Sequence, residues 1–213
     1  MLATLKTLKA LLVDAYPGLE GWSSYNKAEH LAALTFALRP KVAVELGVWA
    51  GRSALPVALA LQASGCGVLW AVDPWSPEAS AEGYTPVNAD WWRKVANHEM
   101  ALAQFLDRLK HLGLLNVVRI VREKSDDFKP PALIDLLHID GQHTAQSSRD
   151  VQRFASRVSS GGIVVMDDTQ WQNDGVQDVQ NAISLLKNLG FVELYSVFVK
   201  DVDDFAVFQR IKE

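Results

Sequence analysis

The chain has 213 residues, a length that suits one domain with a sizeable core. Its formal net charge of −4 argues against a nucleic acid or an anionic membrane as main partner, because either would need a basic surface. No apolar run in the sequence reaches the length of a membrane span. The single cysteine, Cys66, excludes an internal disulfide and suits a reducing compartment, so we expect a cytoplasmic protein.

Residues 1–40 predict a helical segment ahead of the first strand. Leucines recur there at helical spacing, with Lys6 and Lys9 between them, and the long apolar core of a signal peptide is missing. We expect an amphipathic helix that packs either on the domain or on a partner subunit. The spacing fits both, so a homo-oligomer stays an open alternative.

Five short apolar runs predict the strands of a sheet. They are residues 42–46, 68–72, 117–121, 133–139 and 162–166, and most are continuous, as in parallel strands buried on both faces. Helical stretches separate them, so we expect one domain over residues 1–213, an α/β fold with a doubly wound, mostly parallel, Rossmann-like sheet. Two later apolar segments flank the acidic stretch 201–204 and predict an antiparallel hairpin at one edge of the sheet.

Residues 74–97 fit this alternation poorly. The segment is polar at first and then rich in aromatic residues, including Trp91 and Trp92. A long connection at the carboxyl end of a strand is often a lid or a substrate loop. A helical insertion in which the two tryptophans pack is an equal alternative.

A turn with two glycines joins the first strand to the helix after it. Gly47 permits a tight turn, and Gly51 lets the helix begin close to the sheet. The backbone N–H groups of this turn, which ends at Ser53, favour a carboxylate or another acceptor. A dinucleotide site needs a glycine where Trp49 stands, so the turn argues against NAD and FAD. Glu45, at the end of the strand, places an anion near a positively charged part of the ligand.

Acidic and aromatic residues around this turn indicate an adenosyl ligand without phosphate. Asp73 follows the second strand, where a carboxylate accepts the hydroxyl protons of a ribose. Trp49 and Trp75 flank the expected crevice and are suited either to contact the ligand or to pack in the core. Ser125 follows the third strand, at a position suited to capping a helix.

The segments VAVELGVWAGRSALPVALAL and VLWAVDPW resemble the cofactor half of class I S-adenosylmethionine-dependent methyltransferases. The segments LLHIDGQHTAQSSRDVQRF and GGIVVMDDTQW resemble the small O-methyltransferase branch, which includes metal-dependent macrocin-type and catechol-type enzymes. The resemblance implies a seven-stranded sheet with an antiparallel last strand, and S-adenosylmethionine as cofactor. It also implies that residues 47–53 and Glu45 hold the methionine part, Asp73 the ribose, and Ser125 the adenine.

Three carboxylates are expected at the same edge of the sheet. Asp140 follows the fourth strand, and Asp167 and Asp168 follow the fifth. Their mutual repulsion calls for a cation or a proton, and oxygen ligands suit Mg²⁺ or another divalent cation. The resemblance implies that these three residues are the metal ligands of such enzymes. Alternatively, one of the paired acids caps a turn, and Asp140 orients the amino group of the cofactor without a metal.

His143 is the best candidate for a general base at neutral pH. Many members of the branch carry an acid where this chain has Gln142, which puts a carboxylate base in doubt. A structural His143 that hydrogen-bonds to its own loop is the alternative. His138, inside the fourth strand, is expected in the core, and Trp171 is a candidate wall for the acceptor.

These observations lead to one main hypothesis and two alternatives. The main hypothesis is a methyltransferase that uses S-adenosylmethionine to methylate a hydroxyl of a small molecule, held by a divalent cation, with His143 and Asp140 as catalytic residues. In the first alternative no metal takes part and His143 is the base. In the second, the chain binds S-adenosylmethionine without catalysis.

Overall fold

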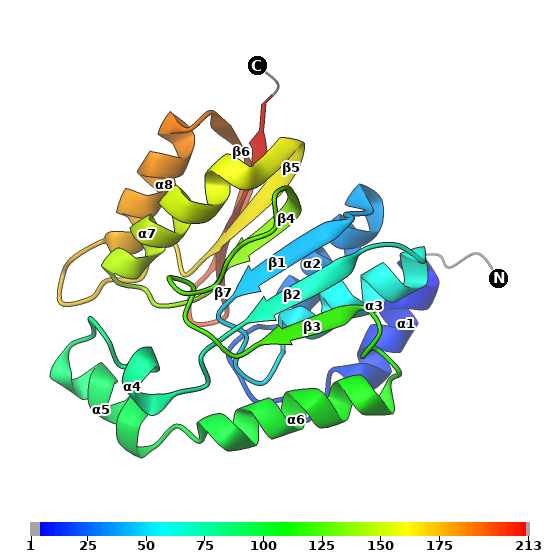
Figure 1. The fold of residues 1–213 in the computed structure, drawn as a ribbon, viewed down its shortest axis with the longest axis horizontal. Coiled ribbons are helices and arrows are strands. Elements are labelled where there is room, and N and C mark those ends of the chain that lie inside the picture. Colours follow the sequence, from blue (N-terminus) through cyan, green and yellow to red (C-terminus); the bar gives the residue numbers. More distant parts are fainter. Residues whose placement is uncertain (1–4, 212–213) are drawn as a thin grey trace.

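A seven-stranded sheet organises residues 5–211, the part of the chain that this computed structural model describes (Figure 1). The strand order is β3-β2-β1-β4-β5-β7-β6. The strands are β1 (Val42–Leu46), β2 (Val68–Val72), β3 (Val118–Val121), β4 (Ile134–Ile139), β5 (Val158–Asp167), β6 (Phe191–Val199) and β7 (Asp203–Arg210). The first five are parallel, and β7 runs antiparallel to both β5 and β6. The predicted α/β sheet and its terminal hairpin are confirmed.

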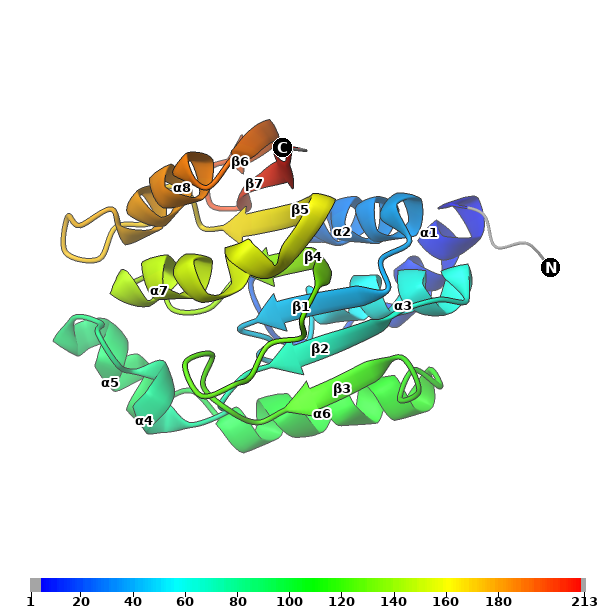
Figure 2. The ribbon, with the colours of Figure 1, turned by 45° about the horizontal axis from the view of Figure 1, so that its top comes forward.

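Helices cover both faces of the sheet (Figure 2). One face packs against α1 (Leu5–Ala15), α2 (Tyr25–Leu38), α3 (Ala54–Ser64) and α6 (His98–His111). The other face packs against α7 (Ala145–Phe154) and α8 (Asp178–Asn188). The central strands β1, β2 and β4 are mostly buried on both faces, which explains why their sequences are mostly apolar. No helix within residues 5–211 is long and apolar enough to cross a membrane.

The fifth strand is longer than its apolar run predicts. It begins at Val158, which pairs with Ile134, whereas the sequence predicts a start at Gly162. The register between β4 and β5 then shifts after Ile134, and Gly161 adopts a positive φ of 79°. The polar residues of this irregular stretch hide the strand from a search for apolar runs.

The connection after β2 forms two short helices, α4 (Pro77–Ser80) and α5 (Pro86–Lys94). The Ser76 side chain caps α4 by accepting a hydrogen bond from the backbone N–H of Ala79. On α5, the rings of Trp91 and Trp92 pack edge to face, with centroids 5.0 Å apart. The segment is therefore helical and uses its tryptophans for packing, and its role as a lid stays a prediction. The ends of the predicted domain, residues 1–4 and 212–213, lie outside the described residues.

Candidate active site

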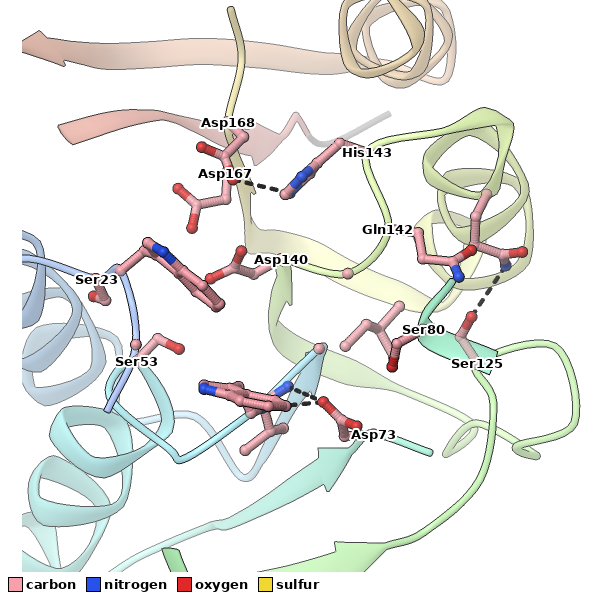
Figure 3. A pocket seen from close by; sticks show the side chains of 18 of the residues that line it. Ser23, Ser53, Asp73, Ser80, Ser125, Asp140, Gln142, His143, Asp167 and Asp168 are labelled. Carbon is pink, nitrogen blue, oxygen red and sulfur yellow. Dashed lines mark hydrogen bonds and ion pairs between the residues drawn. The ribbon is translucent and has the colours of Figure 1, made fainter. Parts of the chain in front are cut away.

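A cavity of about 540 Å³ opens at the carboxyl ends of the central parallel strands (Figure 3). This is the edge at which open α/β sheets bind ligands. Side chains from both halves of the chain and from α4 and α5 line it. Those that matter below are Lys27, Gly47, Trp49, Ser53, Asp73, Tyr84, Ser125, Asp140, His143, Asp167, Asp168 and Trp171.

The turn after β1 forms one wall of this cavity. Gly47 has a φ of +84°, and a Cβ atom there would lie 2.1 Å from the backbone oxygen of Asp140. Only glycine therefore allows the loops after β1 and β4 to cross at this distance. Trp49 also has a positive φ, of 51°. These conformations turn the backbone of the loop toward the cavity.

Asp73 holds this turn in place. Its Oδ2 atom accepts hydrogen bonds from the backbone N–H groups of Val48, at 2.9 Å, and Trp49, at 3.0 Å. Its Oδ1 atom accepts one from the N–H of Trp75, at 2.7 Å. Burial raises the pKa of Asp73, although these N–H groups act in the opposite direction. The carboxylate thus lines the cavity and also shapes the loop beside it.

Three residues expected at the cofactor do not line the cavity. Glu45 is buried and accepts a hydrogen bond from the Ser53 hydroxyl at 2.6 Å. A Cβ on Gly51 would lie 2.1 Å from the ring of Phe105, so this glycine allows the turn after β1 to lie close against α6. Trp75 is 1% exposed, and its Nε1 donates to the backbone oxygen of Trp49 at 2.9 Å. All three support the turn from behind, because the strand end and the loop direct them into the core.

Polar residues of α7 form the far end of the cavity, next to Ser125. The Nε2 of Gln146 donates to Ser125 Oγ, at 3.1 Å, and to Asp150 Oδ1, at 2.9 Å. Burial raises the pKa of Asp150 to about 6, despite hydrogen bonds from these two neighbours. The sequence analysis missed Gln146 and Asp150, although their spacing of four residues places them on one face of a helix.

A buried lysine lies between two of the three predicted carboxylates. Lys27 Nζ donates to Asp140 Oδ2 at 3.2 Å and forms an ion pair with Asp167. Its side chain is 4% exposed, yet it lines the cavity. Ser24 caps α2 by accepting from the backbone N–H of Lys27 at 3.0 Å, which fixes the first turn of the helix. Lys27 could not be predicted as a site residue, because a lysine in a helical segment is usually exposed to solvent.

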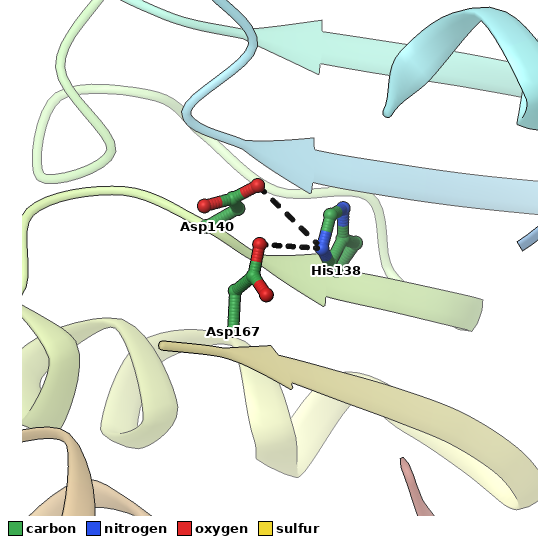
Figure 4. Close-up of side chains that lie close together, drawn as sticks. All are labelled: His138, Asp140 and Asp167. Carbon is green, nitrogen blue, oxygen red and sulfur yellow. Dashed lines mark ion pairs between the residues drawn. The ribbon is translucent and has the colours of Figure 1, made fainter. Parts of the chain in front are cut away.

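Behind this lysine, His138 contacts the same two carboxylates (Figure 4). Its Nε2 lies 3.9 Å from Asp140 Oδ2 and from Asp167 Oδ2, and its Nδ1 lies 3.6 Å from Glu45 Oε2. It is 1% exposed, as expected for a core residue. These separations are too long for hydrogen bonds, so neither carboxylate fixes the orientation of the His138 ring by one.

The third carboxylate pairs with His143. Asp168 adopts a positive φ of 51°, and its Oδ2 lies 2.9 Å from His143 Nε2. The other ring nitrogen, Nδ1, lies 3.5 Å from the hydroxyl of Tyr84, which also accepts from the His143 backbone N–H at 3.0 Å. Burial by itself would lower the pKa of His143, but the charges of Asp168 and Asp140 raise it above its usual value.

Tyr84 comes from the connection between α4 and α5 and was missed by the sequence analysis. Burial raises its pKa to about 12, so its hydroxyl stays neutral at physiological pH.

The adjacent acids Asp167 and Asp168 have different partners: Asp167 pairs with Lys27 and Asp168 pairs with His143.

Within the described part of the chain, two overlapping groups have the spacing of metal ligands. They are His138 with Asp140 and Asp167, and Asp140 with His143 and Asp168, and the ligand atoms of each lie within 4.8 Å of one another. Acids with this spacing are common without a metal. Here Lys27 already lies against Asp140 and Asp167.

Tryptophans gather at the mouth of the cavity. Trp22 lies with its ring centroid 6.2 Å from Trp49, 5.5 Å from Trp91 and 6.0 Å from Trp92. Trp171 lies 5.5 Å from the ring of His143. The cavity thus combines the turn after β1, the carboxylate of Asp73, the ammonium of Lys27, the imidazole of His143 and aromatic walls. This set suits a nucleoside-containing cofactor and a second, less polar ligand.

Comparison with known proteins places the chain among methyltransferases. A family described as "Methyltransferase domain" matches residues 44–169. The O-methyltransferase TomG from Streptomyces achromogenes, solved with S-adenosylmethionine, is 17% identical over 96% of this chain and 90% of that chain, with a TM-score of 0.63. An O-methyltransferase from Bacillus cereus, solved with S-adenosylhomocysteine, is 13% identical over 98% and 90%, with a TM-score of 0.66.

A methyltransferase of Podospora anserina, also bound to S-adenosylhomocysteine, is 16% identical over 98% of this chain and 88% of that chain, with a TM-score of 0.63. At these identities the likeness establishes a shared fold. No curated protein sequence matches the chain significantly.

Proposed function

The chain belongs to the methyltransferase-domain family, and from this premise we propose that it transfers a methyl group from S-adenosylmethionine to a hydroxyl oxygen of a small molecule. The observation that carries the proposal is the turn after β1, with Gly47 crossing the β4 loop and Asp73 holding its N–H groups. The printed names of TomG and of the Bacillus cereus protein support oxygen as the methylated atom.

The cofactor is proposed to lie along the turn. Its methionine part faces residues 47–53, where Ser53 lines the cavity, and its ribose faces Asp73. Its adenine lies toward Ser125 and Gln146, and Trp49 covers it at the mouth. Glu45, Gly51 and Trp75 take no direct contact in this arrangement, because they lie behind the turn.

The acceptor is proposed to lie between His143 and Trp171. His143 takes up the hydroxyl proton, and Asp168 orients the ring through Nε2 and stabilises the imidazolium that forms. Because Nε2 faces Asp168, the proton is taken up at Nδ1, which lies 3.5 Å from the Tyr84 hydroxyl. Methyl transfer disperses the charge of a sulfonium, so proximity and alignment supply most of the rate.

A divalent cation on Asp140, Asp167 and Asp168 stays a prediction of the sequence, and the donor set does not fit it well. Asp140 and Asp167 already pair with Lys27, and Asp168 already pairs with His143. A divalent cation would have to share this space with an ammonium group, which repels it. We therefore propose the metal-independent alternative, with His143 as base.

A screen of small hydroxyl compounds, phenols included, tests the proposal by measuring S-adenosylhomocysteine production with and without EDTA. We expect turnover that EDTA leaves unchanged. The variant His143→Gln should lose about 100-fold to 10,000-fold in kcat, the usual contribution of a general base. His111→Gln, on the exposed end of α6, serves as the control.

Two outcomes of this screen would contradict the proposal. Turnover that EDTA abolishes would restore the metal-dependent hypothesis. Binding of S-adenosylmethionine without turnover on any acceptor would favour a binding module without catalysis.

A further inference from the structure

Lys27 is a charged side chain buried at the centre of the site. Its side chain is 4% exposed, and burial of an ammonium is costly unless carboxylates surround it. Asp140 and Asp167 supply them, from the ends of two adjacent parallel strands. These are two of the three acids that the sequence assigns to a divalent cation.

The segment that leads into α2, the helix that carries Lys27, is held by the turn after β1. Arg52, from that turn, donates from Nε to the backbone oxygen of Ser23 and from Nη1 to that of Leu19, both at 2.7 Å. Asn26 on the same helix donates to Asp203 Oδ2 at 3.1 Å, which ties α2 to β7. Contacts on both sides therefore hold Lys27 in register with the carboxylates.

We propose that Lys27 is the resident cation of this site and replaces the divalent metal ion, binding the acceptor oxygen through its ammonium group. An ammonium has three N–H donors. Two of them go to Asp140 and Asp167, which leaves one for a ligand in the cavity that Lys27 lines. The assignment of the acceptor rests on the proposed function.

An ammonium group in place of a divalent metal ion restricts which acceptors the site can bind. A metal ion chelates two adjacent oxygens, whereas one N–H donor binds a single oxygen. An ammonium also carries one positive charge instead of two, so it stabilises an oxyanion less than a divalent cation does. The site therefore suits an acceptor with one acidic hydroxyl, such as a phenol, and has no requirement for a vicinal diol.

Titration with Mn²⁺, followed by the loss of its free-ion electron paramagnetic resonance signal, tests the proposal without any turnover. We expect wild-type protein to show no saturable binding at millimolar Mn²⁺. Lys27→Gln leaves the carboxylates without a cation, so this variant should bind one Mn²⁺ saturably. Its dissociation constant should lie at least about tenfold below the highest Mn²⁺ concentration at which wild type shows no binding. Lys124→Gln removes another cavity lysine, paired with Glu82, and should bind as wild type does.

A wild-type protein that binds one Mn²⁺, and loses it on Asp167→Asn, would overturn the proposal. That arm needs no Lys27 variant, so it decides the matter even if Lys27→Gln does not fold. Lys27→Arg retains the charge and should reject Mn²⁺. A Lys27→Gln protein that loses S-adenosylmethionine affinity without gaining Mn²⁺ would assign Lys27 to the cofactor and also overturn it.

The two proposals fail separately. Titration of wild-type protein with S-adenosylmethionine tests the proposed function, and the Mn²⁺ titration tests the resident cation. Cofactor binding together with wild-type Mn²⁺ binding would leave a methyltransferase that uses a metal.

Discussion

The Asp73 carboxylate accepts hydrogen bonds from three backbone N–H groups and also faces the cavity. A change to this carboxylate therefore affects both the conformation of the loop and the binding of the ligand. Asp73→Asn places an amide NH₂ against N–H donors. We expect S-adenosylmethionine affinity to fall about 10-fold to 100-fold, since a hydrogen bond to a charged group contributes about 1.5–3 kcal/mol. Quenching of the fluorescence of the cavity tryptophans measures this affinity.

Asp126→Asn is the control for that measurement, because Asp126 lines the same cavity with a side chain that is 40% exposed. Equal affinity in Asp73→Asn and wild type would remove Asp73 from the cofactor site.

Ionisation of Asp150 is expected to make the free energy of unfolding depend on pH. Its folded-state pKa of about 6 lies above the usual 3.8, so its neutral form is favoured in the folded protein. Its contribution to stability is present at low pH and is lost as the pH rises through about 4 to 6, by up to about 3 kcal/mol. Asp150→Asn should therefore be more stable than wild type at pH 8, and the difference should shrink toward pH 4.

Thermal unfolding of both proteins across this pH range measures that difference. A gap between them that stays constant with pH would show that ionisation of Asp150 is not its cause.

Individual site residues were predictable where they follow a strand. Gly47, Asp73, Asp140, Asp167 and Asp168 all line the cavity, because parallel strands bring their carboxyl ends together. Lys27 and Tyr84 were not predictable, because they arrive from an N-terminal helix and from the helical connection after β2. Nothing in their local sequence distinguishes them from exposed residues.

At the scale of elements, the close approach of the turn after β1 to α6 depends on Gly51. Gly51→Ala would place a Cβ atom 2.1 Å from Phe105, whereas Gly65, with a similar positive φ, has no atom within 4 Å of an added Cβ. We expect Gly65→Ala to cost about 1 kcal/mol from backbone strain. Gly51→Ala should cost about 1–3 kcal/mol more from overpacking.

Urea unfolding of the two glycine variants separates strain from overpacking, because only one of them clashes. Equal destabilisation would show that the Phe105 contact relaxes freely.

The ion pair between α2 and β5 is expected to couple these elements. Lys27→Met leaves the buried Asp167 and the partly exposed Asp140 without their cation and should reduce the free energy of unfolding by about 3–5 kcal/mol. In the Asp167→Asn background the same change should cost less, since one of those carboxylates is already neutral. Additive effects in this double-mutant cycle, measured by urea unfolding, would contradict the coupling.

Elements were predictable where the hydrophobic pattern is strong. The first two strands match their predicted ranges, and the hairpin of β6 and β7 lies where it was expected. The early start of β5 was not predicted, because polar residues and glycines obscure its periodicity; pairing with Ile134 of β4 extends the strand there. The two short helices after β2 agree with the helical insertion, one of the two predicted alternatives for residues 74–97, and Ser76 caps the first of them.

At the scale of the whole molecule, the order of the sheet could not be read from the five apolar runs themselves. The resemblance to class I methyltransferases supplied the seven strands and the antiparallel last strand. The structure adds that the edge strand β6 carries exposed apolar residues, with Phe198 62% exposed. A homo-oligomer, which the sequence left as an open alternative, stays a prediction, and sedimentation velocity tests it.

The cavity at the strand ends is proposed to bind S-adenosylmethionine without a metal ion. Calorimetric titration of the wild-type protein with S-adenosylmethionine, in the presence and absence of EDTA, tests this proposal. We predict one site in the micromolar range with the same affinity under both conditions. Absence of binding under both conditions would contradict the proposal and leave only the fold established.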